Sequence, residues 1–224
     1  NDKMLKKVFK LNEKYNKLAE EDEDVHRNVN WKLKKLAWSN LFNYGEGNSI
    51  DFAKLNGIIG IFGKNYSGKS SIIDSILYAI FNSSSKSVRK NVDLINQNKE
   101  HATGEVQFSI GDKVFTIKRE GKKYIKRLHG KASVEAKTDL TFSVFDPATG
   151  ETECLNGQTR NGTDANIRRY LGTLDDFLLT SMISQMNSLN FINEGTTKRK
   201  EILAKFLDLE IFDKKFKKAK EISQ

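Results

Sequence analysis

The residues best suited to chemistry form a glycine-rich stretch at positions 63–70. It reads Gly-Lys-Asn-Tyr-Ser-Gly-Lys-Ser, with a Lys–Ser pair directly after the second glycine. Glycines adopt backbone angles that other residues resist, so the N–H groups of such a loop can turn inward around phosphate oxygens. The lysine of this pattern reaches the β- and γ-phosphates, and the serine hydroxyl binds Mg²⁺. The spacing therefore predicts a P-loop that binds ATP with Mg²⁺.

The prediction gives a role to most positions of this loop. Lys69 is the expected catalytic cation and Ser70 the expected Mg²⁺ ligand. The expected nucleotide-binding residues are Gly63, Lys64, Asn65, Ser67, Gly68, Lys69, Ser70 and Ser71. A random chain of 224 residues would contain the pattern about once in a hundred cases. The segments on either side make a chance match to the P-loop pattern less credible. Residues 58–62 predict a strand buried on both faces, and residues 72–81 predict a buried helix.

Composition and charge limit the classes of protein that the chain can belong to. Its 224 residues, 38% of them hydrophobic, suffice for one large α/β domain. A single cysteine excludes an intramolecular disulfide framework. No stretch approaches the roughly 20 apolar residues of a membrane span, so we expect no membrane contact. The net charge of +9 favours polyanionic partners.

Hydrophobic periodicity divides the rest of the chain into segments. Residues 1–30 predict a charged helical extension, and residues 31–38 and 49–52 predict two paired strands. Apolar residues alternate with polar ones through residues 105–152, with turn residues between the runs, which predicts an antiparallel meander. Helices are expected again from residue 164, with a capping box at residues 173–176 and a final segment that is apolar on one face.

ATP hydrolysis needs more than a P-loop. An ATPase of this kind also needs an apolar strand that ends in aspartate, usually followed by a glutamate that orients water. Asp146 is the only superficial match, but its strand alternates polar and apolar residues and Pro147 follows it. We therefore interpret Asp146 as a turn residue. The chain is expected to be catalytically incomplete.

Several segments around the loop together resemble one family. They are residues 36–45, 50–52, 57–65 and 68–76, and the likeness continues through residues 177–185 and 197–203. In combination they resemble the N-terminal half of the ATPase head of SMC-like DNA-repair ATPases. This family includes bacterial SbcC, the Rad-fifty subunit and the phage recombination-endonuclease subunit. The resemblance covers residues 31–224.

The resemblance implies an α/β fold of the P-loop NTPase class, with an ABC/SMC-like head split in sequence. Residues 31–185 would form the N-terminal lobe, and residues 186–224 would lead into a coiled coil. A later C-terminal half would supply the signature motif and the Asp–Glu pair. Two heads would then dimerise on ATP, and a nuclease subunit of the metallophosphoesterase type would be the partner. We expect an ATPase in the full protein, and ATP binding without efficient hydrolysis in this chain alone. The resemblance also implies a cytoplasmic or nucleoid-associated protein, nuclear in a eukaryote.

The resemblance also implies roles for individual residues. Gln185 matches the Q-loop glutamine, whose amide binds Mg²⁺ and orients the attacking water. Asn65 matches a position beside the γ-phosphate. Phe42 departs from the family pattern, because many relatives carry arginine there.

Basic residues crowd two of the predicted strands. They are Lys113, Lys118, Arg119, Lys122, Lys123, Lys126, Arg127 and Lys131. Such a run is usually a solvated face, but net basicity and the family's DNA-binding heads favour DNA contact at Lys122, Lys123, Lys126 and Arg127. Contacts of this type grip phosphates and do not read sequence.

Three functions remain open from the sequence. The leading one is half of an ATPase head that couples ATP-driven dimerisation to DNA end processing by a nuclease. The second is an SMC-type ATPase that organises chromosomes or tethers DNA without a nuclease. The third is an unrelated P-loop enzyme such as a small-molecule kinase, which the antiparallel meander disfavours.

Overall fold

A computed structural model describes residues 2–21, 30–85, 90–128, 131–181, 195–206 and 209–222. They fall into two compact units, one of residues 29–168 and one that combines residues 1–28 with residues 169–224. The first unit contains the sheet and the P-loop, and the second is helical. Among the described residues, none of the helices combines the length and the apolar character needed to cross a membrane.

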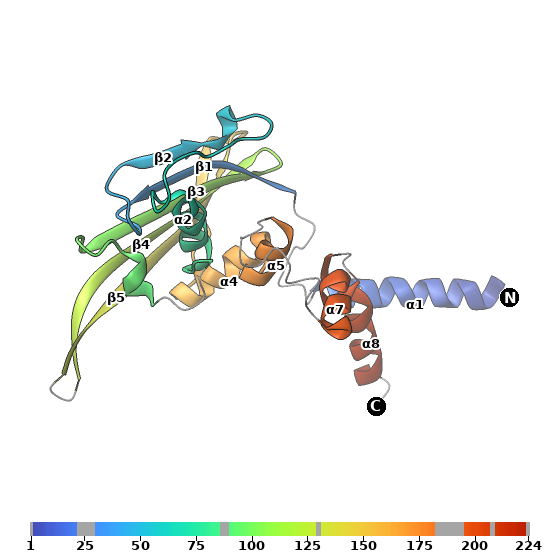
Figure 1. The fold of residues 1–224 in the computed structure, drawn as a ribbon. Coiled ribbons are helices and arrows are strands. Elements are labelled where there is room, and N and C mark those ends of the chain that lie inside the picture. The colour runs from blue at the N-terminus through green and yellow to red at the C-terminus, as the bar shows by residue number, and fades with distance from the viewer. Residues whose placement is uncertain are drawn as a thin grey trace. The chain divides into compact units, whose positions relative to one another are not determined.

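The sheet has six strands in the order β2-β1-β3-β4-β5-β6 (Figure 1). Every pair of neighbouring strands is antiparallel. The strands are β1 (Trp31–Ser39), β2 (Asn48–Asp51), β3 (His101–Ile110), β4 (Lys113–Leu128), β5 (Lys131–Asp146) and β6 (Glu151–Cys154). Strands β3 to β6 follow one another both in the chain and in the sheet, which confirms the predicted meander.

Alternation along the strands produces the core of this unit. Phe108, Phe115 and Phe142 come from three successive strands and stack on one face, with ring centroids 5.3 Å and 6.0 Å apart. All three side chains are buried, and burial of each large apolar side chain contributes about 1.5–3 kcal/mol. The intervening residues point to the opposite face of the sheet.

Four short helices accompany the sheet. They are the 3₁₀ turn η1 (Phe52–Lys54), α2 (Lys69–Phe81), α3 (Asn91–Leu94) and α4 (Arg160–Leu171). Helix α2 packs on β3 and β4, and its last turns are buried, as the apolar pattern of residues 72–81 predicted.

The contact between α2 and the sheet is very close, and two strand glycines make it possible. An added Cβ at Gly104 would lie 2.9 Å from Cδ1 of Tyr78, and one at Gly121 would lie 2.6 Å from the Tyr78 hydroxyl oxygen. The Tyr78 ring therefore occupies the space that side chains at these positions would need. Burial raises the pKa of Tyr78 to about 12, so its hydroxyl stays neutral in the core.

The predicted strand at residues 58–62 is wrong. Those residues form neither strand nor helix, and Ile58 and Phe62 are 103% and 93% exposed. A strand that is buried on both faces needs hydrogen-bonding neighbours and a cover. Within the described residues, no strand pairs with this segment.

The second unit consists of helices. They are α1 (Asp2–Glu21), α5 (Leu174–Thr180), α7 (Thr196–Phe206) and α8 (Glu210–Ile222). The predicted capping box at the start of α5 is present, because Thr173 and Asp176 exchange side chain-to-backbone hydrogen bonds. Helices α1 and α8 contact each other, and Nζ of Lys215 donates to Oδ1 of Asn12 at 3.1 Å.

We predict that Gly104→Ala lowers the free energy of unfolding by about 1–3 kcal/mol, because the new methyl group overpacks the contact with Tyr78. Urea unfolding followed by circular dichroism measures this change. Gly45→Ala is the matched control, because open space surrounds that glycine, and its effect should stay within about 0.5 kcal/mol. Equal stability of the two variants would contradict the close packing.

Candidate nucleotide-binding site

The P-loop passes directly into the N-terminus of α2. Gly68 has φ +92° and is the N-cap residue, and Lys69 is the first residue of the helix. That φ value lies in the left-handed region, where a side chain is strained. Gly63 opens the loop, and a Cβ there would lie 2.9 Å from Oγ of Ser67. The backbone conformation thus requires glycine at position 68, and the close approach of the Ser67 hydroxyl favours glycine at position 63.

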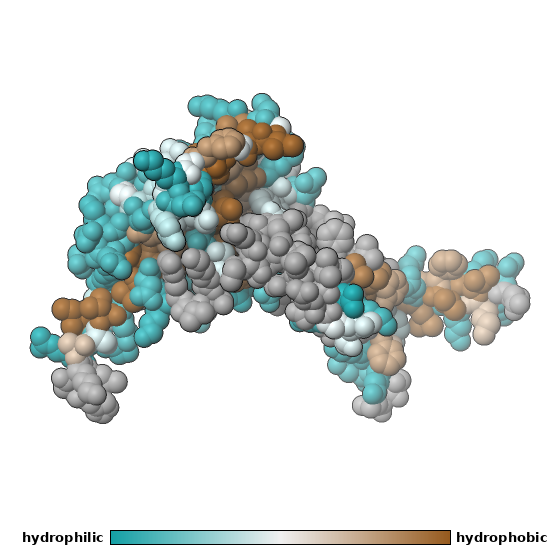
Figure 2. Space-filling model, in the orientation of Figure 1, coloured by the Kyte–Doolittle hydropathy of each residue, from teal (hydrophilic) through white to brown (hydrophobic). Residues whose placement is uncertain are grey.

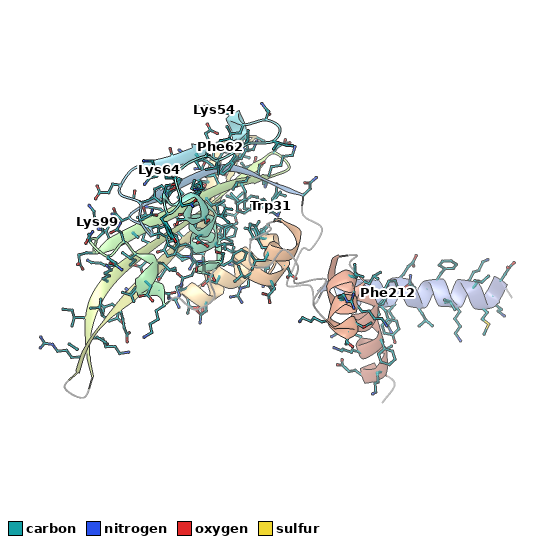
Figure 3. The ribbon with its side chains drawn as sticks, in the orientation of Figure 1. Trp31, Lys54, Phe62, Lys64, Lys99 and Phe212 are labelled. Carbon is teal, nitrogen blue, oxygen red and sulfur yellow. The ribbon has the colours of Figure 1, made fainter. Side chains whose placement is uncertain are left out.

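Lys69 folds back over its own loop. Its Nζ donates to the carbonyl oxygens of Gly63 at 2.8 Å and Lys64 at 2.7 Å. Figure 3 labels Lys64 beside α2. The ammonium therefore spans the mouth of the loop at the positive end of the helix dipole. Both features favour an anion at this point.

Backbone donors in the loop remain available to such an anion. The N–H of Ser67 donates to the carbonyl of Lys64 at 3.3 Å. Within the described part of the chain, the exposed N–H groups of Lys64, Asn65 and Tyr66 donate to no protein atom. Ser70 is exposed in the first turn of α2. This donor set fits the phosphates of a nucleotide, with the Ser70 hydroxyl available to Mg²⁺.

The segment of residues 40–44 supports the loop from the side. The Tyr44 hydroxyl donates to the carbonyl of Gly68 at 3.1 Å. The Asn43 side chain lies against Gly68, since a Cβ there would be 2.7 Å from Oδ1 of Asn43. Trp38 contacts the Tyr44 ring edge to face, with centroids 5.1 Å apart. The sequence patterns indicated no individual role for Asn43 or Tyr44, although both lie in a segment that carried the family resemblance.

Backbone hydrogen bonds hold this supporting segment in an unusual conformation. Asn40 and Phe42 have φ values of +56° and +55°. The N–H of Phe42 donates to the carbonyl of Leu94 at 2.9 Å, and the N–H of Asn96 donates to the carbonyl of Asn40 at 2.8 Å. Burial raises the pKa of Tyr44, which keeps its hydroxyl protonated as a donor.

Of the four predicted DNA-binding residues, Lys123, Lys126 and Arg127 lie on the arm that β4 and β5 form beyond the other strands (Figure 1). Lys122 lies at the base of this arm, where it still pairs with His101 of β3. Strand alternation puts Lys122 and Lys126 on one face of the arm and Lys123 and Arg127 on the other. Lys123 is already engaged, because its Nζ donates to the carbonyls of Asn96 and Gln97 at 2.9 Å and 3.2 Å. The four residues therefore do not form a single surface.

Electrostatic pairing further reduces the free charge of the arm. Lys126 forms an ion pair of 3.0 Å with Glu135 on the adjacent strand. The Tyr124 hydroxyl and the Lys126 ammonium both hydrogen-bond Glu135 and hold the pKa of that carboxyl below its ordinary value. Both groups are exposed, so solvent screens the pair.

Three other sequence expectations have different outcomes. Gln185 lies outside the described residues. Asp146 is the predicted turn residue, because it ends β5, accepts from the N–H of Ala148 at 2.9 Å and pairs with Lys113. Arg119 belongs to the basic run expected to be solvated, and this expectation is wrong because its side chain is fully buried. Strand alternation directs it into the core beneath α2.

A family model described as "AAA domain" matches residues 35–224, most of the chain. The chain belongs to this AAA domain family. The match includes the P-loop, α2, the whole meander and the helices that follow. It confirms the α/β fold of the P-loop NTPase class, and together with the S. aureus relative below it supports the resemblance to an SMC-like ATPase head.

Two curated relatives extend this assignment. Protein R555 of Acanthamoeba polyphaga mimivirus is 33% identical over 188 residues, which are 82% of this chain and 13% of the relative. The SbcC subunit of the nuclease SbcCD from Staphylococcus aureus (strain MRSA252) is 28% identical over 169 residues, 73% of this chain and 16% of the relative. The chain thus spans less than a fifth of the length of either protein.

A solved structure is also similar. It is that of the recombination mediator protein RecF with ATP, from the RecFOR pathway, with a TM-score of 0.41 and 16% sequence identity. The similarity covers 83% of this chain and 40% of that chain.

We predict that Tyr44→Phe weakens ATP binding about 2- to 10-fold, because it removes one hydrogen bond to the Gly68 carbonyl and keeps the ring that packs on Trp38. Titration with a fluorescent ATP analogue measures the affinity. Tyr124→Phe removes a hydroxyl that binds Glu135 on the distant arm, and it should leave the affinity unchanged. Equal affinities for both variants would exclude a supporting role for Tyr44.

Proposed function

We propose that this chain is the ATP-binding half of the ATPase head of a DNA-repair or recombination protein. In that protein the head dimerises on ATP and regulates the processing of DNA ends by a nuclease subunit of the metallophosphoesterase type. The observation that carries the proposal is the convergence of Lys69, the free loop amides and the N-terminus of α2 within a chain of the AAA domain family. The S. aureus relative, named as part of a nuclease, supports the nuclease partner.

ATP binding would use groups that are already in position. The Lys69 ammonium would exchange its bonds to the Gly63 and Lys64 carbonyls for the β- and γ-phosphates. The loop amides and the N-terminus of α2 would surround the phosphates. The Ser70 hydroxyl would hold Mg²⁺, which neutralises charge on the phosphate oxygens.

The exposed segment of residues 58–62 supports a composite head. Figure 2 shows apolar atoms, in brown, gathered near the position at which Figure 3 labels Phe62. Ile58, Ile61 and Phe62 are all exposed, and covering each would contribute about 1.5–3 kcal/mol. We propose that a strand from the C-terminal half of the same head pairs with this segment. That half would also bring the Asp–Glu pair, which hydrolysis requires.

Two further residues belong to the proposed composite site. Gln185 would bind Mg²⁺ through its amide oxygen and orient the attacking water, as the family resemblance implies. The signature serine of a second head would contact the γ-phosphate. Dimerisation would thus complete each site, and ATP would act as the link between two heads.

Sequence-independent DNA contact is proposed for the β4–β5 arm. Lys122 lies directly opposite Lys137 on an exposed face, where like charges repel and Asp139, 3.7 Å from Lys137, offsets only one of the two. Lys126 lies on the same face and Arg127 at the end of the arm. Their chemistry suits phosphate oxygens, so binding should weaken steeply with salt. Lys123 contributes to the fold of the arm instead.

We predict that this chain alone binds ATP with Mg²⁺ but hydrolyses it negligibly, because the acidic residues of the site are absent from its described part. Lys69→Ala should weaken ATP binding about 10- to 100-fold, the effect of losing charged hydrogen bonds. Equilibrium binding and a phosphate-release assay test both statements. Turnover above roughly 0.1 per second that disappears in Lys69→Ala would contradict the incomplete site.

A second prediction concerns DNA. Replacing Lys122, Lys126 and Arg127 together with glutamate should lower DNA affinity and reduce the slope of log affinity against log salt by about 3, while ATP binding stays intact. Fluorescence anisotropy with duplexes of two unrelated sequences at several salt concentrations measures both quantities.

The control for total charge is the triple glutamate variant at Lys3, Lys6 and Lys10, which are exposed on α1. It changes the net charge by the same amount and should keep most of the affinity. If the arm variant and this control behaved alike, the arm would not be the DNA-binding surface.

A further inference from the structure

Arg119 on β4 joins the C-terminal end of α2 to α4. Its Nε donates to the carbonyl oxygen of Ala79 at 3.1 Å, and its Nη2 donates to the carbonyl oxygen of Ile80 at 3.0 Å. The same Nη2 also donates to Oδ1 of Asp164 on α4 at 2.7 Å. The Arg119 side chain is 0% exposed, whereas that of Asp164 is 22% exposed.

The two carbonyls are groups that α2 itself leaves without partners. The last carbonyls of a helix have no intrahelical donor. Asn82 ends α2 with φ +54°, and its N–H closes on the carbonyls of Leu77 and Tyr78. The carbonyls of Ala79 and Ile80 remain for the guanidinium, whose charge suits the negative end of the helix dipole.

The contacts of Arg119 tolerate little change, because a buried charge that loses a partner is strongly destabilising. One nitrogen serves both helices, so a shift of the Ile80 carbonyl changes the bond to Asp164. A rigid guanidinium fork transmits such a shift better than a flexible ammonium. The contact thus makes the position of α4 depend on the end of α2.

The other end of α2 is the P-loop. The helix has 13 residues and is about 20 Å long. It is held on the sheet in its last turn, where Tyr78, directly before Ala79 and Ile80, packs over Gly104 and Gly121. Because a helix is stiff, a displacement at Lys69 tilts its axis about this contact and changes the direction of the Ala79 and Ile80 carbonyls.

We propose that Arg119 is a positioning residue that couples occupancy of the P-loop to α4 through Asp164. The proposal rests on the proposed binding of ATP at residues 63–70. In the chain, α4 precedes the segment that carries Gln185. The coupling therefore joins the phosphate-binding loop to the helix that leads toward the second half of the site.

Amide hydrogen exchange of the 224-residue chain tests this coupling. Binding of ATP with Mg²⁺ should slow exchange within α4 of the wild-type chain. In Asp164→Ala this response of α4 should be lost, while the affinity for a fluorescent ATP analogue changes by less than about fivefold, the lower end of coupling between sites. Asp164→Glu, which keeps the carboxylate, should restore the response.

Asp139→Ala is the matched control, since this exposed aspartate of β5 lies 3.7 Å from Lys137 and the strand register directs its side chain to the face opposite that of Arg119. Its α4 response should equal that of the wild type. If Asp164→Ala does not fold, as judged by thermal unfolding, Asp164→Asn carries the test and should show a reduced response.

Two results would overturn the coupling. One is an α4 response to ATP that is the same in the wild type and in the Asp164 variants. The other is a wild-type chain that binds ATP without any response in α4. Absence of ATP binding to the wild-type chain would instead refute the proposed function, and the coupling with it.

Discussion

Helix α2 touches the sheet so closely that the backbone of two strands must be glycine beneath it. Tyr78 lies over Gly104 and Gly121 in the space that side chains would fill. The P-loop precedes α2 and Arg119 receives its last carbonyls, so the location of both depends on this one contact. A side chain at Gly104 or Gly121 would push α2 away from the sheet and would displace the phosphate-binding groups with it. Close packing of one helix thus sets the geometry of the site.

Within the described residues, the P-loop is supported by protein from one side. Tyr44 and Asn43 hold Gly68 from the side of the sheet, and Lys69 spans the mouth of the loop. Beside it, residues 58–62 expose apolar side chains that a finished P-loop domain would bury. The proposed split head would leave such an uncovered apolar segment beside the half-site. Asp146 is a turn residue because it ends β5 and accepts a hydrogen bond from the N–H of Ala148.

The basic residues of β4 illustrate how the fold redistributes a charge cluster. In the sequence they form one dense run, yet strand alternation sends Arg119 into the core and divides the others between two faces. Lys123 binds backbone carbonyls and Lys126 pairs with Glu135. The run therefore serves core packing, local structure and an exposed arm at once, and the proposed DNA contact is confined to the arm and its base.

By itself the sequence determined the P-loop, the antiparallel meander, the capping box at Thr173 and the family resemblance. These are local patterns, in which neighbouring residues specify their own turn, period or cap. Tertiary structure alone decided that residues 58–62 lie uncovered, that Arg119 is a buried link to Asp164 and that Tyr44 supports Gly68. Each of these depends on a partner distant in the chain: a neighbouring strand for residues 58–62, the end of α2 and α4 for Arg119, and the Gly68 carbonyl for Tyr44. Apolar composition signals that a segment should be buried, but only the assembled fold provides what buries it.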